Sequence, residues 1–144
     1  MTTSPSYDPE NIFAKILRGD LPCHKVHEDE KTMAFMDIMP RADGHTLVIP
    51  KAPSRNILDI EPDDLQHLIL VVQKIARAVK QAFDGDGATI AQFSEAAGGQ
   101  EVFHTHFHVM PRHEGVELRA PGTMADNAVL AEHARKLVET LARR

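Results

Sequence analysis

The sequence predicts an α+β domain with a mostly antiparallel sheet and one long helix packed across that sheet. Four apolar segments bounded by turn residues are typical of strands: residues 31–38, 44–50, 88–94 and 101–111. Another segment, residues 61–83, repeats apolar side chains every three to four positions and is typical of a long helix. With 144 residues, the chain is long enough to bury a core around these elements as one domain.

Further elements are expected at the two ends of the chain. Residues 1–8 are predicted to form a flexible arm. Pro9 suits the first turn of a short helix that Gly19 would end. Residues 114–144 are predicted to form a loop and a terminal helix that packs on the domain or across a dimer. Its apolar positions are expected in the core or an interface: Leu130, Leu137 and Leu141.

The long helix over residues 61–83 carries the clearest signals. Pro62 and its acidic neighbours suit a helix N-terminus, and basic residues gather towards the C-terminal end. One face is predicted to be buried, and it carries Leu65, Leu68, Val72, Ile75 and Val79. This helix is expected to cover one face of the sheet.

Composition and charge limit the classes of function. A net charge of −5 argues against a broad nucleic-acid surface, because phosphate-backbone binding needs a basic excess. Cys23 is the only cysteine, so no intrachain disulfide and no cysteine-rich zinc site is expected. The first ten residues lack the pattern of a signal peptide, and the longest apolar run is too short to cross a membrane. A cytoplasmic protein with no nucleic-acid or membrane partner is therefore expected.

Three histidines alternate along the predicted strand 101–111. Side chains on a strand alternate between faces, so His104, His106 and His108 are expected on one face. The opposite face, mostly apolar, is the natural core side. Three interpretations remain open at this point: an exposed row of imidazoles, a metal site, and nucleophilic chemistry on phosphorus.

A metal site and chemistry on phosphorus require different arrangements of these histidines. On a straight strand the outer histidines lie roughly 13 Å apart at the backbone, so one ion would rarely bind all three. A metal could still take two of them with help from His45, His24 or a carboxylate. A neutral imidazole is a competent nucleophile when its other nitrogen is held by an acceptor. Gly98 and Gly99 directly upstream allow main-chain N–H groups to approach an anion.

The residues around the histidines resemble the histidine-triad (HIT) family. The segment "GGQEVFHTHFHVMPR" is similar to the family signature, in which three alternating histidines precede two apolar residues. "NIFAKILRGDLP" and "HEDEKTMAFMDIMPRADGHTLVIPK" follow the family in the same order, so the resemblance covers residues 9–113. It is closest to the nucleotide-binding, phosphoramidase-like branch and its bacterial relatives.

The resemblance implies a homodimer and a nucleotidyl hydrolase or transferase acting at the α-phosphate of a nucleotide, with a purine nucleotide as the expected ligand. His106 would be the nucleophile and would form a covalent nucleotidyl-histidine that water hydrolyses to a nucleoside monophosphate. His104 and His45 match positions that support the nucleophile, and His108 matches one that contacts phosphate. No cofactor is implied. The implied nucleotide-binding residues are Ile12, Phe13, Ile16, Phe35 and Ile38 around the base, Asp37 at the ribose, Ser94 near the leaving group, and Gly99, Gln100 and Glu101 in the phosphate loop.

The chain departs from the family pattern at four places. Thr105 replaces an apolar residue on the expected core side, where its hydroxyl needs a partner. Glu101 stands where Ser or Thr is common, and its carboxylate would repel an anionic substrate while its N–H could still serve. Ser94 stands where Asn is common. Some relatives bind a structural zinc through Cys-x-x-Cys, but Asn11 and Ala14 occupy those positions here, so no metal is expected.

Four functions are weighed on these observations. The first is metal-independent hydrolysis of a nucleoside phosphoramidate or a similar nucleotide, and the second is dinucleoside polyphosphate hydrolysis with the same nucleophile. A metal-dependent hydrolase and a non-enzymatic nucleotide-binding module are the others, and the latter gains weight from Glu101 and Ser94. The histidines without motif support are expected to be ordinary surface residues: His24, His67, His113 and His133.

Overall fold

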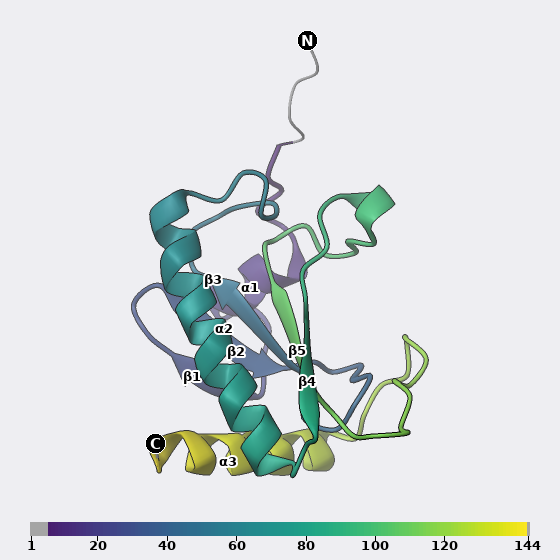
Figure 1. The fold of residues 1–144 in the computed structure, drawn as a ribbon. Helices are drawn as coiled ribbons and strands as arrows, with labels where there is room; N and C mark the ends of the chain where they lie inside the picture. Colours follow the sequence, from purple (N-terminus) through teal and green to yellow (C-terminus); the bar gives the residue numbers. More distant parts are fainter. Residues whose placement is uncertain (1–5, 144) are drawn as a thin grey trace.

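The computed structural model describes residues 6–143, which form one antiparallel sheet with helices packed around it (Figure 1). The five strands lie in the order β1-β2-β3-β5-β4. Their bounds are β1 Lys25–Glu28, β2 Thr32–Met36, β3 Thr46–Pro50, β4 Gly87–Ala91 and β5 Phe107–Arg112. The helices are α1 Ile12–Arg18, α2 Pro62–Ala82 and α3 Asn127–Ala142, with a 3-10 turn, η1, at Ala96–Gly98. The predicted α+β class and antiparallel pairing are confirmed.

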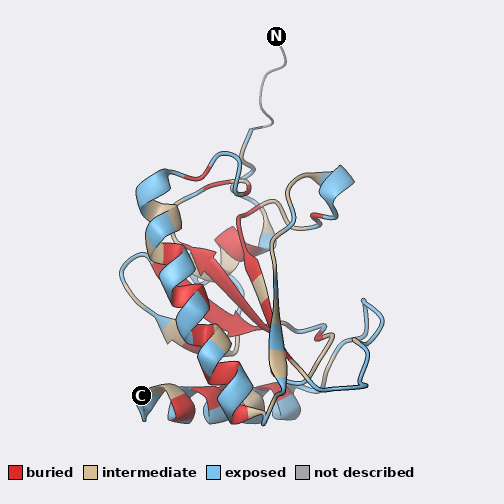
Figure 2. Cartoon of the chain, viewed as in Figure 1, coloured by how far each residue is buried: buried red, intermediate tan, exposed pale blue. Residues whose placement is uncertain are grey.

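The two faces of the sheet bury separate apolar clusters. Successive strand residues point to opposite faces, so Ala34 and Val48 face one way while Phe35 and Ile49 face the other. The first face packs against α2 and α3, and Figure 2 shows the buried stripe of α2 turned towards it. The second face packs against Phe13 of α1. The sheet therefore has a thick core on one side and a thinner cover on the other.

The long helix is confirmed over nearly its whole predicted length. Pro62 occupies its first position, and acidic Asp63 and Asp64 lie in the first turn. Leu68, Val72, Ile75 and Val79 are all buried, as the periodicity predicts; Leu65 is partly buried against the same cluster. Within residues 6–143 no helix combines the length and apolar character needed to cross a membrane.

The first helix begins later than predicted. It starts at Ile12 rather than in the turn of Pro9, because the Asn11 side chain accepts a hydrogen bond from the N–H of Ala14 at 2.9 Å and caps the helix there. Gly19 ends the helix in the left-handed conformation with φ +84°, as predicted. The predicted helix and its end at Gly19 are therefore confirmed, but its predicted start is wrong.

The predicted strand over residues 101–111 is wrong in its first half. β5 begins only at Phe107, and it pairs with β3 from Val48 opposite Phe107 onwards. Upstream, Thr105 donates its N–H to the Ser54 carbonyl at 2.9 Å instead of joining a ladder. Its hydroxyl lies 2.6 Å from the Ser54 hydroxyl, which supplies the partner that a buried threonine needs. His104 and His106 consequently precede the strand.

Where the structure describes them, both ends of the chain pack against the body of the protein. Residues 1–5 of the predicted flexible arm lie outside the described part of the chain. Tyr7, by contrast, is half-buried against the body of the protein. At the other end Leu130 and Leu137 of α3 are buried against α2, so both belong to the core of the chain itself. Leu141 packs partly against the same cluster.

Candidate active site

Four histidines gather on the sheet face that carries α1. Antiparallel pairing of β3 with β5 places His45, just before β3, beside His108, with ring centroids 5.2 Å apart. The ring of His106 lies 5.0 Å from His108 and packs edge-on against Phe13 at 4.8 Å. His104 is fully buried behind them. The structure therefore brings the sequence-predicted histidines together, although only His108 belongs to a regular strand.

The tautomer of His106 is fixed by a main-chain carbonyl. Its Nδ1 lies 2.7 Å from the carbonyl oxygen of His104. A carbonyl oxygen only accepts hydrogen bonds, so Nδ1 of His106 must carry the proton. Burial lowers the pKa of His106, which keeps the ring neutral at neutral pH. The lone pair of His106 is therefore on Nε2.

A second chain of hydrogen bonds fixes His45 and His108. The main-chain N–H of Arg41 donates to Nδ1 of His45 at 3.0 Å, so the proton of His45 is on Nε2. That nitrogen lies 2.9 Å from Nδ1 of His108 and donates to it. Burial lowers the pKa of His45 to about 3 and that of His108 to about 4. Neutral His108 consequently keeps its own proton on Nε2, where it can be donated to a ligand.

His104 is held at both ring nitrogens. Its Nε2 lies 2.8 Å from the carbonyl oxygen of Pro50. Its Nδ1 lies 2.6 Å from the hydroxyl of Tyr7. Burial lowers the pKa of His104 to about 4. The ring itself is therefore engaged on both sides, and only the carbonyl of this residue faces the next histidine.

Asp37 completes a group that has the spacing of a metal site. A carboxylate oxygen of Asp37 lies 3.4 Å from Nε2 of His45, and donor atoms of Asp37, His45 and His108 all lie within 4.8 Å of one another. His45 could bind a metal through Nε2 only after losing the proton there, because Arg41 donates to its Nδ1. Ligation would require breaking that Arg41 hydrogen bond. Burial, with the charge of Glu101 nearby, raises the pKa of Asp37 to about 6.

Gln100 is committed to the protein rather than free for a ligand. Its side-chain oxygen accepts from the Glu95 N–H at 2.8 Å and from Asn56 at 3.1 Å. Its side-chain nitrogen donates to the carbonyls of Arg55 at 2.7 Å and Val102 at 3.0 Å. These four bonds use every donor and nearly all the accepting capacity of a glutamine amide. The Gln100 side chain therefore shapes the loop and has no donor left for phosphate.

The main chain of the glycine loop is also largely occupied. The N–H groups of Gly98, Gly99 and Gln100 donate within the loop, to Glu95 and Ala96 carbonyls. In the described part of the chain, the N–H of Glu101 makes no such hydrogen bond, so it is a donor that an anion could use. Gly99 adopts φ +97°, which explains the glycine there. Nearby, the Ser94 hydroxyl donates to the Gln92 side chain at 3.0 Å.

The five residues expected around a base fall into two groups. Phe13 and Phe35 are buried and pack edge-to-face at 5.6 Å, so they form the floor under the surface. Ile16 packs partly against the same cluster. Ile12 and Ile38 have 47% and 42% of their surface exposed. These two offer open apolar surface on which a planar base can lie.

Three contacts of the site have no counterpart in the sequence pattern. Tyr7 and the carbonyl of Pro50 hold His104, and the N–H of Arg41 holds His45. Two of these are main-chain groups, so their residue type carries no signal. Tyr7 is the only tyrosine of the chain, but it lies so far from the histidine motif in the sequence that nothing linked the two. Each of the histidines without motif support has partners outside this cluster: His24, His67, His113 and His133.

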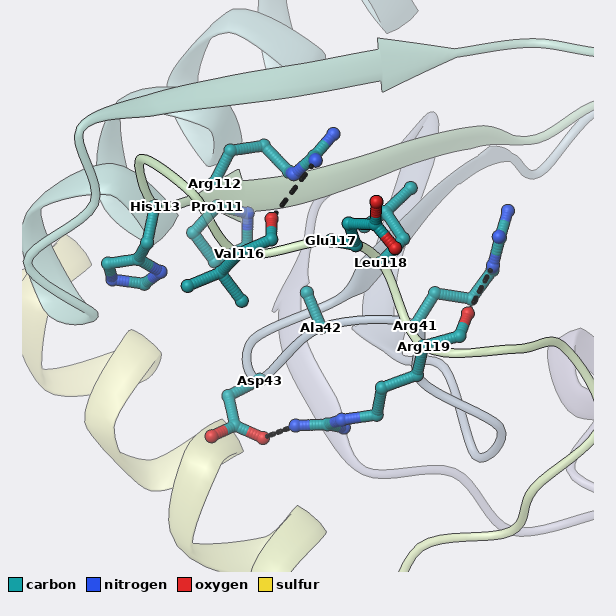
Figure 3. A pocket seen from close by; sticks show the side chains of 10 residues that line it. All are labelled: Arg41, Ala42, Asp43, Pro111, Arg112, His113, Val116, Glu117, Leu118 and Arg119. Carbon is teal, nitrogen blue, oxygen red and sulfur yellow. Dashed lines mark hydrogen bonds and ion pairs between the residues drawn. The ribbon is translucent and has the colours of Figure 1, made fainter.

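A separate cleft of about 170 Å³ lies between the turn after β2 and the segment after β5 (Figure 3). Arg41, Arg112 and Arg119 line it, and none of the clustered histidines does. The guanidinium of Arg41 donates to the Arg119 carbonyl at 2.9 Å, and Arg119 pairs with Asp43. These bonds tie the C-terminal segment to the turn that carries the Arg41 N–H. The cleft is therefore next to the clustered histidines, through Arg41, but none of their side chains lines it.

Comparisons with known proteins find chains of similar sequence and fold. A family model described as the HIT domain matches residues 18–115. A crystal structure of a Hit-like protein from Bartonella henselae superposes with a TM-score of 0.92 at 51% identity, covering 94% of this chain and 99% of that one. A Zn-bound histidine triad family protein from Mycobacterium smegmatis superposes with a TM-score of 0.83 at 36% identity, covering 93% and 94%. An adenosine 5′-monophosphoramidase from Candida albicans is 33% identical over 139 residues, covering 92% of this chain and 91% of that protein.

Proposed function

The chain belongs to the HIT domain family, and we propose that it cleaves purine nucleoside phosphoramidates at the α-phosphate through a covalent nucleotide on His106. One observation carries this proposal: the unprotonated Nε2 of His106 lies in the same cluster as the protonated Nε2 of His108. The first is a nucleophile and the second is a donor to phosphate. The related protein from Candida albicans is named as a phosphoramidase, which agrees with this substrate class.

In the proposed reaction, Nε2 of His106 forms a bond to phosphorus while the bond from phosphorus to the amine nitrogen breaks. The amine leaves with the bonding electrons and takes a proton from water. The modified imidazole is cationic, and its Nδ1–H remains bonded to the carbonyl oxygen of His104. Water then attacks phosphorus, releases the nucleoside monophosphate, and loses its proton to solvent. His106 returns to its starting tautomer without any rearrangement of the protein.

The surrounding groups are proposed to bind the phosphate and the nucleoside. Nε2–H of His108 and the N–H of Glu101 donate to phosphoryl oxygens, where negative charge develops. Ile12 and Ile38 contact the base from their exposed surfaces. Asp37 accepts from the ribose hydroxyls. In this arrangement His45 supports the nucleophile indirectly, because its direct partner is His108.

The proposed reaction uses no metal ion. The support comes from the protonation of His45. To bind a metal, His45 would have to move its proton from Nε2 to Nδ1, where the Arg41 N–H already donates. Turnover is therefore expected to survive dialysis against a chelator at unchanged rate. Loss of turnover with chelator and its return with Zn²⁺ would instead support a metal-dependent hydrolase, a comparison that the Zn-bound relative makes worthwhile.

The amine leaving group is favoured over a polyphosphate by charge. Glu101 and Asp37 are close enough for the charge of Glu101 to raise the pKa of Asp37. Two carboxyl groups beside the site oppose a highly anionic leaving group and tolerate a neutral or cationic amine. We expect an adenosine phosphoramidate to turn over faster than a diadenosine polyphosphate in parallel assays. The reverse order would identify a dinucleoside polyphosphate hydrolase.

The central test is to trap the covalent intermediate. Quench-flow mixing with an adenosine phosphoramidate should yield adenylylated protein, with the nucleotide on His106 by peptide mass spectrometry. His106→Asn and His106→Ala should lower kcat at least about a thousandfold while nucleotide binding persists. His24→Gln, a change of a partly buried histidine outside the cluster, serves as the matched control. Turnover in either His106 variant, or a folded enzyme that never carries nucleotide, would exclude this mechanism.

We also propose that the chain forms a two-fold homodimer through the β4 edge. β4 is the last strand of the sheet, so one side of it offers unpaired main-chain groups. Ile90 on this strand and Phe93 just after it are 47% and 37% exposed. An unprotected apolar edge is suited to pairing with a second copy. Ile90→Lys should produce monomers in sedimentation velocity runs where the wild type is dimeric; a monomeric wild type would refute the dimer.

A further inference from the structure

The segment before α1 contacts the buried histidine behind the reaction centre. The Tyr7 hydroxyl lies 2.6 Å from Nδ1 of His104, and the tyrosine ring meets that imidazole edge-on with centroids 5.6 Å apart. The two residues are 97 positions apart in the sequence. His104 has no exposed surface, and among residues 6–143 its ring nitrogens are held by two groups, this hydroxyl and the Pro50 carbonyl. The contact is therefore a specific tertiary interaction.

The direction of this hydrogen bond follows from the opposite side of the imidazole. The Pro50 carbonyl oxygen, 2.8 Å from Nε2 of His104, only accepts, so Nε2 carries the proton. Burial lowers the pKa of His104 to about 4, and the neutral ring leaves a lone pair on Nδ1. The Tyr7 hydroxyl must therefore be the donor. Without it, Nδ1 would be a buried acceptor with no partner, which costs free energy.

His104 connects this contact to the nucleophile. Its carbonyl oxygen accepts Nδ1–H of His106 at 2.7 Å, and that bond decides which nitrogen of His106 is free. The ring of Phe13 lies edge-on to both imidazoles, 6.5 Å from His104 and 4.8 Å from His106. Movement of the His104 ring would therefore shift both the acceptor and the packing of the nucleophile.

The segment that carries Tyr7 is also fastened to the glycine loop. Arg55 donates to the Ser6 carbonyl at 3.4 Å. The same guanidinium forms a two-point pair with the Glu95 carboxylate, at 2.8 and 3.0 Å. Glu95 in turn donates its N–H to Gln100, which fixes the loop before Glu101. The arm, the loop and the histidines are thus joined by polar contacts.

We propose that Tyr7 is a positioning residue for the His106 nucleophile. Its hydroxyl donates to Nδ1 of His104 and holds that imidazole in one place, and the His104 carbonyl then keeps Nε2 of His106 unprotonated and oriented. The inference rests on the proposed nucleotidyl transfer to His106. It assigns a role in turnover to a residue that lies outside the histidine motif.

Tyr7→Phe tests the hydroxyl and keeps the ring. We expect kcat and the rate of nucleotidyl-His106 formation to fall about tenfold, the effect of one hydrogen bond to a buried acceptor, while KM changes less than about twofold. Glu10→Gln is the matched control, because it removes only an exposed ion pair with Arg18 at 3.7 Å. That variant should keep the wild-type kcat.

Imidazole ¹⁵N resonances separate positioning from simple stabilisation. In the wild type, His104 should show a protonated Nε2 and a hydrogen-bonded, unprotonated Nδ1. In Tyr7→Phe, the Nδ1 resonance should move towards that of a free imidazole nitrogen, and His106 should show a mixture of tautomers. A purely structural role would lower the thermal midpoint and shift only His104 Nδ1, leaving the His106 resonances of the folded state unchanged.

The outcomes distinguish this inference from the proposed function. An unchanged kcat in folded Tyr7→Phe overturns it, and so does a reduced kcat with wild-type His106 resonances. If the wild type forms no nucleotidyl-His106, the proposed function fails instead. The resonances of Tyr7→Phe would then still decide whether Tyr7 holds the His104 ring by a hydrogen bond to Nδ1.

Discussion

At the scale of single residues, main-chain groups decide what each histidine can do. The Arg41 N–H sets the proton of His45, which sets that of His108. The His104 carbonyl sets the proton of His106. Four imidazoles with the same intrinsic chemistry thereby acquire different protonation patterns, and the proposed mechanism uses one as a nucleophile and one as a donor. The imidazole itself does not determine which nitrogen is protonated, because a neutral imidazole can carry its proton on either one.

A pair of substitutions at His45 tests this order. Glutamine can still accept from the Arg41 N–H and donate to His108, whereas phenylalanine can do neither. We expect His45→Phe to lower kcat about 10- to 100-fold, because two buried hydrogen bonds are lost, and His45→Gln to lower it less. Steady-state kinetics of the two variants on one phosphoramidate measure this. Equal losses would show that His45 acts through its shape or charge and not through the hydrogen-bond chain.

The site was predictable from the sequence to the extent that spacing carries information. Alternation identified His104, His106 and His108, and the resemblance added His45 and Asp37. Protonation was not predictable, because it depends on carbonyl and N–H groups brought close only by folding. For the same reason Gln100 was predicted as a ligand residue, whereas its amide is used within the loop.

At the scale of elements, the turn into β3 is held by one glycine. Gly44 has φ +88°, and a Cβ there would lie 2.7 Å from two ring carbons of Phe83. We expect Gly44→Ala to lower the free energy of unfolding by about 2 kcal/mol or more and to reduce kcat by displacing His45. Gly19→Ala is the control, since φ is +84° but nothing lies within 4 Å of the added atom.

Urea unfolding of the two glycine variants decides between strain and packing. Both substitutions place an L side chain in the left-handed region, so both should cost about 1 kcal/mol from the backbone alone. Only Gly44→Ala adds the clash with Phe83. Equal losses in the two variants would mean that the Phe83 ring moves aside freely and that the turn is not tightly packed.

Elements were predictable where the chain has a long, regular pattern. α2 repeats its apolar residues over 21 positions, so its existence and face were correct. β1 was missed, because its four residues, Lys25–Glu28, are mostly polar and carry little strand signal. The start of β5 was misplaced because Thr105 bonds to Ser54, a contact that the local pattern does not contain. Short elements form through tertiary contacts, so their local sequence does not predict them.

At the scale of the whole molecule, the buried histidines make stability depend on pH. An unfolded histidine binds a proton below about pH 6.5. In the folded state burial keeps His45 neutral down to about pH 3, and His104 and His108 down to about pH 4. Between those limits the unfolded chain binds more protons, so stability falls as pH decreases, by about 1.4 kcal/mol per pH unit for each group.

Asp37 acts in the opposite direction. Its folded pKa is raised to about 6, against 3.8 for an ordinary aspartate, so the folded state binds more protons between these values. Its contribution therefore improves as pH falls, and it offsets one of the three histidines. For these three histidines and Asp37 together, the expected loss from pH 6 to pH 4.5 is about 3 kcal/mol per pH unit, and the lowered pKa of His106 acts in the same direction.

Urea unfolding at several pH values checks this balance. Asp37→Asn should steepen the loss of stability below pH 6, because the opposing carboxyl is gone. His104→Gln should make it shallower, because one proton uptake on unfolding is removed. A wild-type free energy of unfolding that stays constant from pH 7 to pH 4.5 would contradict the burial of neutral histidines.

The separation of the site residues along the chain has a consequence for folding. His45 meets His108 across 63 positions, and Tyr7 meets His104 across 97. Contacts of such high sequence separation form late, since the loop-closure entropy must be overcome before they stabilise the chain. The β1–β2 hairpin and α2 are local and can form early. In the proposed mechanism, a chain emerging from the ribosome therefore has no ordered nucleophile until β5 has been synthesised and paired, and recovery of the proposed activity is expected to mark the last step of folding.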